Sequence, residues 1–274
     1  MTSDQADGIV AVDIDNKVAH VQLLGEGDDN RLTDGLLTSL ATVLGELEED
    51  DDVWLVTLRG AKGRLGRDPE PLVPDPPPVP VSSGGRLARA MLRSRTTSAG
   101  TDVFAALRRF PKPIVALLEG LTSGRALGIA LCCDLRVASS GATMSCPEVL
   151  HGAIPTYAVT QLLPRLIGVS YANDLLLTGR ALSAAEAVSI GLVSRVAESG
   201  ELEATLADLV AALRAAAPLA TRFAKEAVVA GAELPLEAGI TLELDLSLIL
   251  QLSHDRAEGL RAFHGRRPPH YEGR

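Results

Sequence analysis

Residues 111–155, PKPIVALLEGLTSGRALGIALCCDLRVASSGATMSCPEVLHGAIP, decide the fold of this chain. The stretch begins with residues 114–118, an apolar run of the length of a strand. Glycines then bend the chain, and the next run, RALGIALCC, is rich in helix formers. A strand, a turn and a helix in this order leave the first backbone N–H groups of the helix without partners inside it. Because these donors lie at the positive end of the helix dipole, the sequence predicts a place for an anion or a developing oxyanion.

The same stretch carries a pattern of spaced residues that continues on both sides of it. The matching positions are Lys112, Pro113, Ile114, Gly120, Gly124, Leu127, Cys133, Asp134, Ala138, Pro147, Glu148, Gly152, Ile154 and Pro155. Their spacing resembles the enoyl-CoA hydratase/isomerase (crotonase) superfamily, whose members carry KPxIAxxxGxxxGGGxxLxxxCDxxxA, a short spacer, PE and GxIP. Residues 177–187 and the tail at residues 253–268 resemble the same family, and the resemblance weakens only between residues 61 and 100.

The fold that this resemblance implies is α/β. We expect a crotonase spiral of ββα units over residues 1–200, followed by a C-terminal helical trimerisation region, residues 201–274. Patterns within single segments agree, since alternating and apolar runs at residues 9–14 and 18–24 predict a hairpin. Residues 236–252 are apolar on more faces than one monomer can cover. We therefore expect a homotrimer or a dimer of trimers.

Composition and charge exclude several classes of partner. The formal net charge of −9 argues against nucleic acid, which requires a basic face. No apolar run reaches about 18 residues, so we expect no membrane span. The three cysteines lack CxxC spacing and give neither a disulfide framework nor a metal site, and the acidic N-terminus shows no export signal. These features predict a cytoplasmic protein with reduced thiols and no bound metal.

Acyl-thioester chemistry of this kind requires N–H donors for the thioester oxygen and a carboxylate that moves a proton. The resemblance assigns the two donors to the backbone N–H groups of Leu65 and Arg125. It assigns Gly124 and Asp68, which flank these donors, to substrate binding. Arg125 stands where the family has glycine, so its side chain is either a new cation near the site or a solvent-facing arginine.

Hydratases of the family carry two glutamates, and this chain retains one of them. The first position is Gly128, which holds no proton, and the second is Glu148. The resemblance makes Glu148 catalytic, whereas the spacing of Ser145 and Glu148 also fits a capping box, which would make the carboxylate structural. A single carboxylate fits the proton shuttle of an enoyl isomerase better than the addition of water.

Further residues are assigned to the binding of substrate. His151 lies three positions after Glu148 and faces either the site or the core. Phe263, Arg266 and Arg267 match positions that contact the adenine or the phosphates of coenzyme A, often across a subunit boundary. The alternative for the two arginines is a basic C-terminus that faces solvent. Coenzyme A would be part of the substrate, so we expect no separate cofactor. Residues 157–159 replace the GxGGT that often forms the pocket wall in the family.

Three functions remain open from the sequence. The first is an enzyme of the enoyl-CoA isomerase/hydratase type that stabilises a thioester enolate, acting on an acyl-CoA or an acyl-carrier thioester. The second is a catalytically impaired homologue that binds acyl thioesters. The third is a decarboxylase of a carboxylated acyl thioester, with Arg125 holding the carboxylate. Residues 69–85, with seven prolines between positions 69 and 80, predict a segment without regular structure, either a lid or docking strip or a surface insertion.

Overall fold

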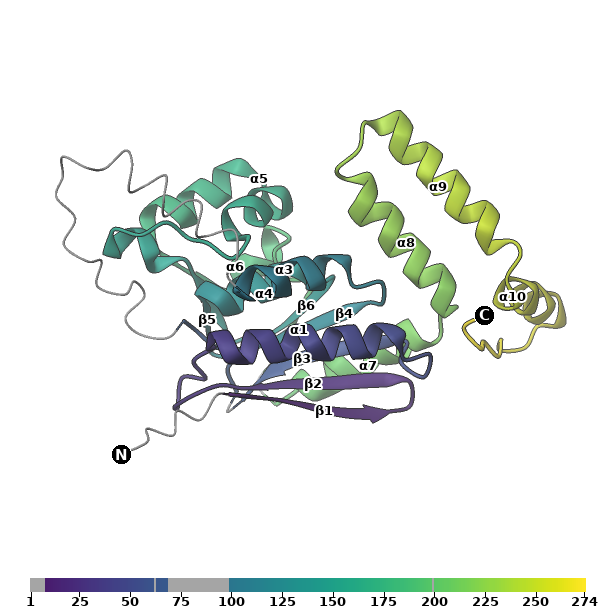
Figure 1. Cartoon of the computed structure of the whole chain (residues 1–274), viewed down its shortest axis with the longest axis horizontal. Helices are drawn as coiled ribbons and strands as arrows, with labels where there is room; N and C mark the ends of the chain where they lie inside the picture. The colour runs from purple at the N-terminus through teal and green to yellow at the C-terminus, as the bar shows by residue number, and fades with distance from the viewer. Residues whose placement is uncertain (1–7, 62, 69–98, 199) are drawn as a thin grey trace.

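The structure is a computed structural model that describes residues 8–61, 63–68, 99–198 and 200–274. The proline-rich segment 69–85 lies outside the described residues. A six-stranded sheet has the order β1-β2-β3-β4-β6-β9, and a smaller sheet has the order β5-β7-β8 (Figure 1). The strands are β1 Ile9–Asp15, β2 Val18–Leu24, β3 Leu55–Gly60, β4 Ile114–Leu118, β5 Leu121–Ser123, β6 Leu135–Ser139, β7 Thr143–Ser145, β8 Ala181–Ser183 and β9 Arg195–Ala197.

The predicted hairpin at the start of the chain is confirmed. Strands β1 and β2 pair antiparallel, and the turn between them is made by Asn16 and Lys17, both at positive φ. From β2 onward the large sheet is parallel, so each connection must cross over, and helices cover both of its faces. Every residue of β4 is buried for this reason, as the apolar run predicted.

Helices supply the layers on either side of the sheet. They are α1 Asp34–Glu49, α3 Ala99–Arg109, α4 Gly124–Cys132, the 3₁₀ helix η3 Pro147–His151, α5 Val159–Thr178, α6 Ala184–Ser189, α7 Leu202–Arg214, α8 Pro218–Gly231, α9 Leu236–Leu250 and α10 His254–Gly265. Thr33 caps α1 through a 3.2 Å hydrogen bond from the backbone N–H of Leu36. In α5 the backbone breaks at Gly168 (φ 79°), where two helical segments meet. Helix α7 packs its buried leucines against β4 and β6.

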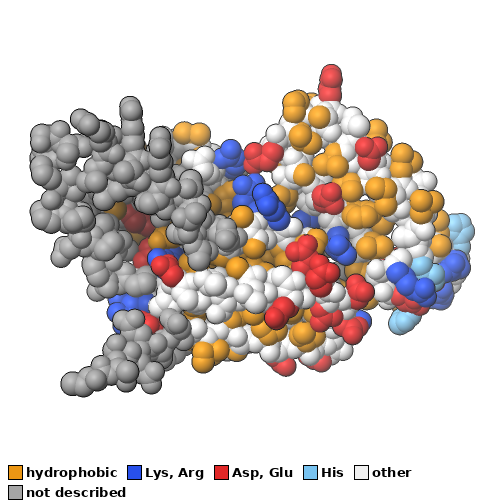
Figure 2. Space-filling view, in the orientation of Figure 1, with side chains coloured by type: hydrophobic (Ala, Val, Ile, Leu, Met, Phe, Trp, Pro, Cys, Tyr) orange, Lys and Arg blue, Asp and Glu red, His pale blue; other side chains and the backbone are white. Residues whose placement is uncertain are grey.

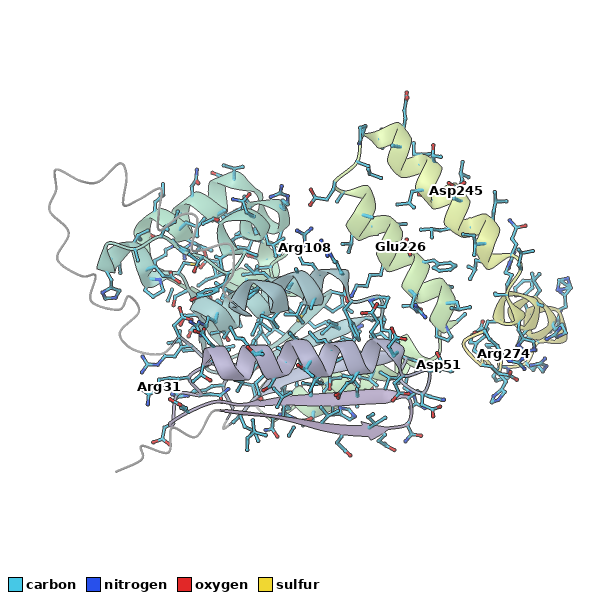
Figure 3. All side chains as sticks on the ribbon, in the orientation of Figure 1. Arg31, Asp51, Arg108, Glu226, Asp245 and Arg274 are labelled. Carbon is cyan, nitrogen blue, oxygen red and sulfur yellow. The ribbon has the colours of Figure 1, made fainter. Side chains whose placement is uncertain are left out.

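The last three helices project away from the body of the chain (Figure 1). Helix α9 packs antiparallel against α8 and exposes many large apolar side chains, among them Leu236, Ile240, Leu244, Leu248 and Ile249. Behind α10 the tail folds back, since the backbone N–H of Asp255 donates to the carbonyl of Arg274, labelled in Figure 3, at 3.0 Å. Across the described residues, no single helix is long and apolar enough to cross a membrane, although the bent pair α7–α8 passes that test jointly.

Candidate active site

The first turn of α4 lies beside the loop that precedes residue 69. The backbone N–H of Ser123 donates to the carbonyl of Gly66 at 3.3 Å, which brings Leu65 close to the start of α4. Asn30 holds this loop in place, because its amide donates to the carbonyl of Leu65 at 2.9 Å. The two segments that carry the expected donors, Leu65 and Arg125, therefore come together although they are far apart in sequence.

A carboxylate occupies the anion position that the sequence predicted at this helix start. The backbone N–H of Arg125 donates to Oδ1 of Asp68 at 2.9 Å. The carboxylate lies directly over Gly124, since a Cβ at that residue would stand 2.2 Å from Oδ2 of Asp68. Gly124 also has φ 54°, so both the close approach and the backbone conformation require glycine here. Burial raises the pKa of the Asp68 carboxyl, whereas the N–H and the charge of Arg125 lower it.

The side chain of Arg125 folds over the site instead of facing solvent. It is 14% exposed, so the alternative of a solvent-facing arginine is wrong. Its Nη1 lies 2.6 Å from a carboxylate oxygen of Asp34, and its Nε lies 3.5 Å from Oδ1 of Asp68. Nε also donates to the hydroxyl of Tyr157 at 3.1 Å, and the guanidinium stands over that ring, 5.1 Å from its centre. Two carboxylates thus balance the charge of this guanidinium.

Glu148 is the second buried carboxylate of the site. It is 6% exposed, and its Oε2 accepts no hydrogen bond from any residue that the structure describes. Burial raises the pKa of the Glu148 carboxyl. A hydrogen bond from its own backbone lowers this pKa, the charge on Asp68 raises it, and His151 lowers it. His151 itself is exposed at the end of η3.

The capping-box interpretation of Glu148 is wrong. Pro147 begins the 3₁₀ helix η3, so the N-cap residue is Cys146, which makes no side-chain capping bond, and Ser145 belongs to the preceding strand β7. Proline, which lacks a backbone N–H, is well suited to the first helical position, and this moves the helix start one residue beyond the predicted cap. The burial of Glu148 is therefore not explained by a capping role.

The space beside Gly128, where family hydratases carry their other glutamate, is already filled. A Cβ at Gly128 would lie 2.3 Å from the carbonyl oxygen of Tyr157 and 2.9 Å from the ring of Phe104. Tyr157 and Ala158 reach this place with φ of 55° and 65°, which residues other than glycine seldom adopt. Sequence reasoning did not assign Tyr157 a role; the signal was the loss of glycines from the GxGGT positions.

The expected coenzyme A contacts of the tail lie far from this cluster within one chain. Helix α10 and the residues after it are at the opposite end of the molecule from α4 (Figure 1). Phe263 is 79% exposed, and Arg266 is exposed as well. Arg267 forms a two-pronged ion pair with Glu258, at 2.6 and 3.0 Å. Within one chain, α10 and the start of α4 therefore lie apart (Figure 1).

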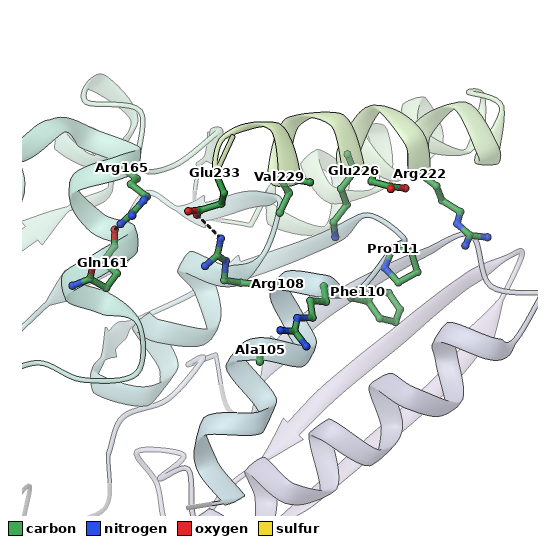
Figure 4. A pocket seen from close by; sticks show the side chains of 13 residues that line it. Ala105, Arg108, Phe110, Pro111, Gln161, Arg165, Arg222, Glu226, Val229 and Glu233 are labelled. Atoms are coloured by element: carbon green, nitrogen blue, oxygen red, sulfur yellow. Dashed lines mark hydrogen bonds and ion pairs between the residues drawn. The ribbon is translucent and has the colours of Figure 1, made fainter. Parts of the chain in front are cut away.

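A separate cleft of about 710 Å³ lies between α3, α5 and α8 (Figure 4). Its lining is strongly charged, and Arg108 forms a 3.1 Å ion pair across it with Glu233. Figure 2 shows basic side chains gathered where the body of the chain meets α8. Neither Asp68, Arg125 nor Glu148 lines this cleft. Within the described part of the chain, no group of three His, Cys, Asp or Glu residues could hold a metal ion.

We expect Glu148→Gln to stabilise the fold at neutral pH. Unfolded, the carboxyl has its ordinary pKa of about 4.3; folded, its pKa is raised. Below the pKa of the unfolded state, the Glu148 carboxyl is protonated in both the folded and the unfolded protein. As pH rises through the higher pKa of the folded state, the wild type loses stability. The stability of the variant relative to the wild type should therefore rise between pH 4 and 8, and the difference should fade near pH 4.

Thermal unfolding of both forms between pH 4 and 8 measures this difference. Glu46→Gln, at an exposed position of α1, is the matched control and should show no such trend. A Glu148→Gln variant that is less stable than the wild type at every pH would contradict the expectation.

Comparison with known proteins agrees with this geometry. The sequence profile described as Enoyl-CoA hydratase/isomerase matches residues 82–274. The (E)-benzylidenesuccinyl-CoA hydratase of Thauera aromatica is 33% identical over 96% of this chain and 99% of that protein. The short-chain-enoyl-CoA hydratase of Clostridium acetobutylicum is 29% identical over 93% of this chain and 94% of that protein. The crystal structure of an enoyl-CoA hydratase from Bacillus anthracis superposes with a TM-score of 0.85, at 29% identity and over 97% of this chain and 99% of that one.

The chain therefore belongs to the enoyl-CoA hydratase/isomerase family, which is a family of enzymes. The expected α/β crotonase fold with a helical C-terminal region is confirmed.

Proposed function

We propose that this protein stabilises the enolate of an acyl-CoA thioester and moves a proton on its acyl chain, in the manner of an enoyl-CoA isomerase or hydratase. The observation that carries the proposal is Glu148, a buried carboxyl with a raised pKa and an oxygen that no described residue satisfies. Such groups cluster at sites where a proton is transferred. Coenzyme A enters as part of the substrate.

In the proposed reaction the thioester oxygen accepts hydrogen bonds from the backbone N–H groups of Leu65 and Arg125. To do so it takes the place that Oδ1 of Asp68 now occupies, so the carboxylate of Asp68 turns aside when the substrate binds. These donors stabilise the negative charge that develops on the oxygen. For a 3-enoyl thioester, Glu148 takes a proton from C2, a dienolate forms, and the proton returns to C4, which gives the 2-enoyl product.

The alternatives have weaker support. A decarboxylase would require Arg125 to hold a substrate carboxylate, but Asp34 and Asp68 already balance that guanidinium. A buried carboxyl oxygen without a hydrogen-bond partner, as in Glu148, lowers the stability of the fold. In a homologue that only binds thioesters, no catalytic role would offset this loss of stability. An acyl-carrier thioester would fit the same site as an acyl-CoA, because the two compounds share the acyl group and the thioester and differ only in the carrier.

The test is the turnover of 3-hexenoyl-CoA and crotonyl-CoA by the wild type, together with the affinity for acyl-CoA. Turnover of either compound supports the proposal. Binding of acyl-CoA without turnover of any enoyl-CoA would instead support the binding homologue.

We also propose that the chain forms a homotrimer or a dimer of trimers, which would bring Phe263, Arg266 and Arg267 of one copy toward another. Helix α9 exposes a long apolar face that one chain does not cover, and only Leu246 of this helix is buried.

Light scattering at micromolar concentration should therefore give about three or six times the mass of one chain. Leu244→Glu, on the exposed face of α9, should lower that mass, whereas Glu243→Gln beside it should not. A monomeric wild type would contradict the proposal.

A further inference from the structure

The proposed reaction assigns no role to the hydroxyl of Tyr157. This polar group bonds to Arg125 in the first turn of α4. The chain holds this residue in an unusual backbone conformation, since Tyr157 and Ala158 follow one another at φ 55° and 65°. Such positions cost free energy and persist where the surrounding structure enforces them, often at functional sites. The backbone strain does not by itself define a role for Tyr157, and the contacts of its side chain are therefore decisive.

The tyrosine ring is fixed by packing on two helices. Its ring lies 5.4 Å from that of Phe104 on α3, measured between ring centres. The residue's carbonyl oxygen and Cβ close the space beside Gly128 on α4. The side chain therefore stands against the helix that carries the expected oxyanion donor.

The direction of one hydrogen bond decides where the hydroxyl proton can go. Nε–H of Arg125 donates to the oxygen of Tyr157 at 3.1 Å, so the hydroxyl proton points elsewhere. The same Nε lies 3.5 Å from Oδ1 of Asp68, which is the oxygen held by the backbone N–H of Arg125. The tyrosine oxygen and this carboxylate oxygen thus both lie within 3.5 Å of the same nitrogen atom.

We propose that the hydroxyl of Tyr157 donates a hydrogen bond to the thioester oxygen of the substrate and is a side-chain member of the oxyanion hole. The inference rests on the proposed function, in which the thioester oxygen replaces Oδ1 of Asp68 on the N–H of Arg125. The hydrogen bond from the guanidinium polarises the hydroxyl and makes it a stronger donor. No proton leaves Tyr157, so the step requires no further reactant.

The charges around the site give this donor a physical purpose. The carboxylate of Asp68 gives up its place on the N–H of Arg125, but it belongs to the loop beside the start of α4, so its negative charge still opposes the formation of an enolate nearby. A neutral donor whose bond strengthens as charge develops favours the transition state over the ground state. Tyr157, which is bonded to the same guanidinium, supplies such a donor.

The test is Tyr157→Phe, which keeps the ring against Phe104 and removes only the hydroxyl. We expect kcat for 3-hexenoyl-CoA or crotonyl-CoA to fall about 10²- to 10³-fold, the usual effect of removing one oxyanion-hole donor. The melting temperature and the affinity for acyl-CoA should stay close to the wild type. Tyr171→Phe, at an exposed position of α5, is the matched control and should change none of these quantities.

A spectroscopic measurement separates a donor from a residue that only packs. The absorption band of bound cinnamoyl-CoA moves to longer wavelength when donors polarise its thioester carbonyl, so this red shift should shrink in Tyr157→Phe. If Tyr157→Phe kept the kcat and the red shift of the wild type, the inference would be overturned. A lower kcat with an unchanged red shift would overturn it as well. Neither result would contradict the proposed function. A wild type that neither binds nor turns over any acyl-CoA would overturn the proposed function itself.

Discussion

Replacement of Glu148 by glutamine should lower turnover of enoyl-CoA about 10²- to 10⁴-fold, the usual effect of removing a general acid or base. The amide keeps the size of the side chain but cannot carry the proton between C2 and C4. Affinity for acyl-CoA should persist, because the thioester oxygen is held by other groups. The loss should therefore appear in kcat and in kcat/KM equally.

Steady-state kinetics with 3-hexenoyl-CoA and crotonyl-CoA measure this effect, and isothermal titration with acyl-CoA measures the affinity. Glu46→Gln serves again as the control for a glutamine substitution at a distant surface. Unchanged turnover in Glu148→Gln, on a substrate that the wild type processes, would remove Glu148 from the mechanism.

Introduction of the missing glutamate as Gly128→Glu should destabilise the fold instead of creating a hydratase. A Cβ at Gly128 would stand 2.3 Å from the backbone oxygen of Tyr157, and backbone cannot move aside as cheaply as a flexible side chain. Overpacking costs about 1 to 3 kcal/mol. The burial of another carboxylate adds a desolvation penalty of several kcal/mol. We expect a loss of about 3 kcal/mol or more.

For a chain of this size, such a loss lowers the melting temperature by about 6 °C or more. Gly45→Glu is the matched control, because Gly45 is exposed on α1 and a Cβ there meets nothing within 4 Å. It should leave the melting temperature unchanged or raise it slightly. If Gly128→Glu melted like the wild type and gained hydratase activity, Tyr157 would not be a fixed wall of the site.

Local patterns in the sequence were sufficient to predict most of the fold. The hairpin, the strand β4 and the helix α4 that follows it depend on neighbours in sequence, and the structure confirms them. Family spacing likewise located Glu148 and the start of α4. The capping box failed because a second local signal, Pro147, moved the helix start.

The contacts that give the site its particular chemistry could not be predicted in this way. Asp68 bonds to Arg125 across 57 positions of sequence, and Arg125 bonds to Tyr157 across 32. Neither pair has a fixed spacing in the sequence, because each depends on how a loop or turn meets α4 in three dimensions. The sequence showed only that glycines were missing where Arg125 and Tyr157 stand.

The burial of Cys146 has a consequence for the proposed reaction, in which the substrate is an unsaturated thioester. Such substrates are Michael acceptors, and the thiolate form of cysteine adds to them. Cys146 lies two residues before Glu148, yet it is 2% exposed, and burial together with the charge of Glu148 raises the pKa of its thiol to about 12. The thiol therefore stays protonated at neutral pH. The proposed substrate would therefore find no thiolate at this position.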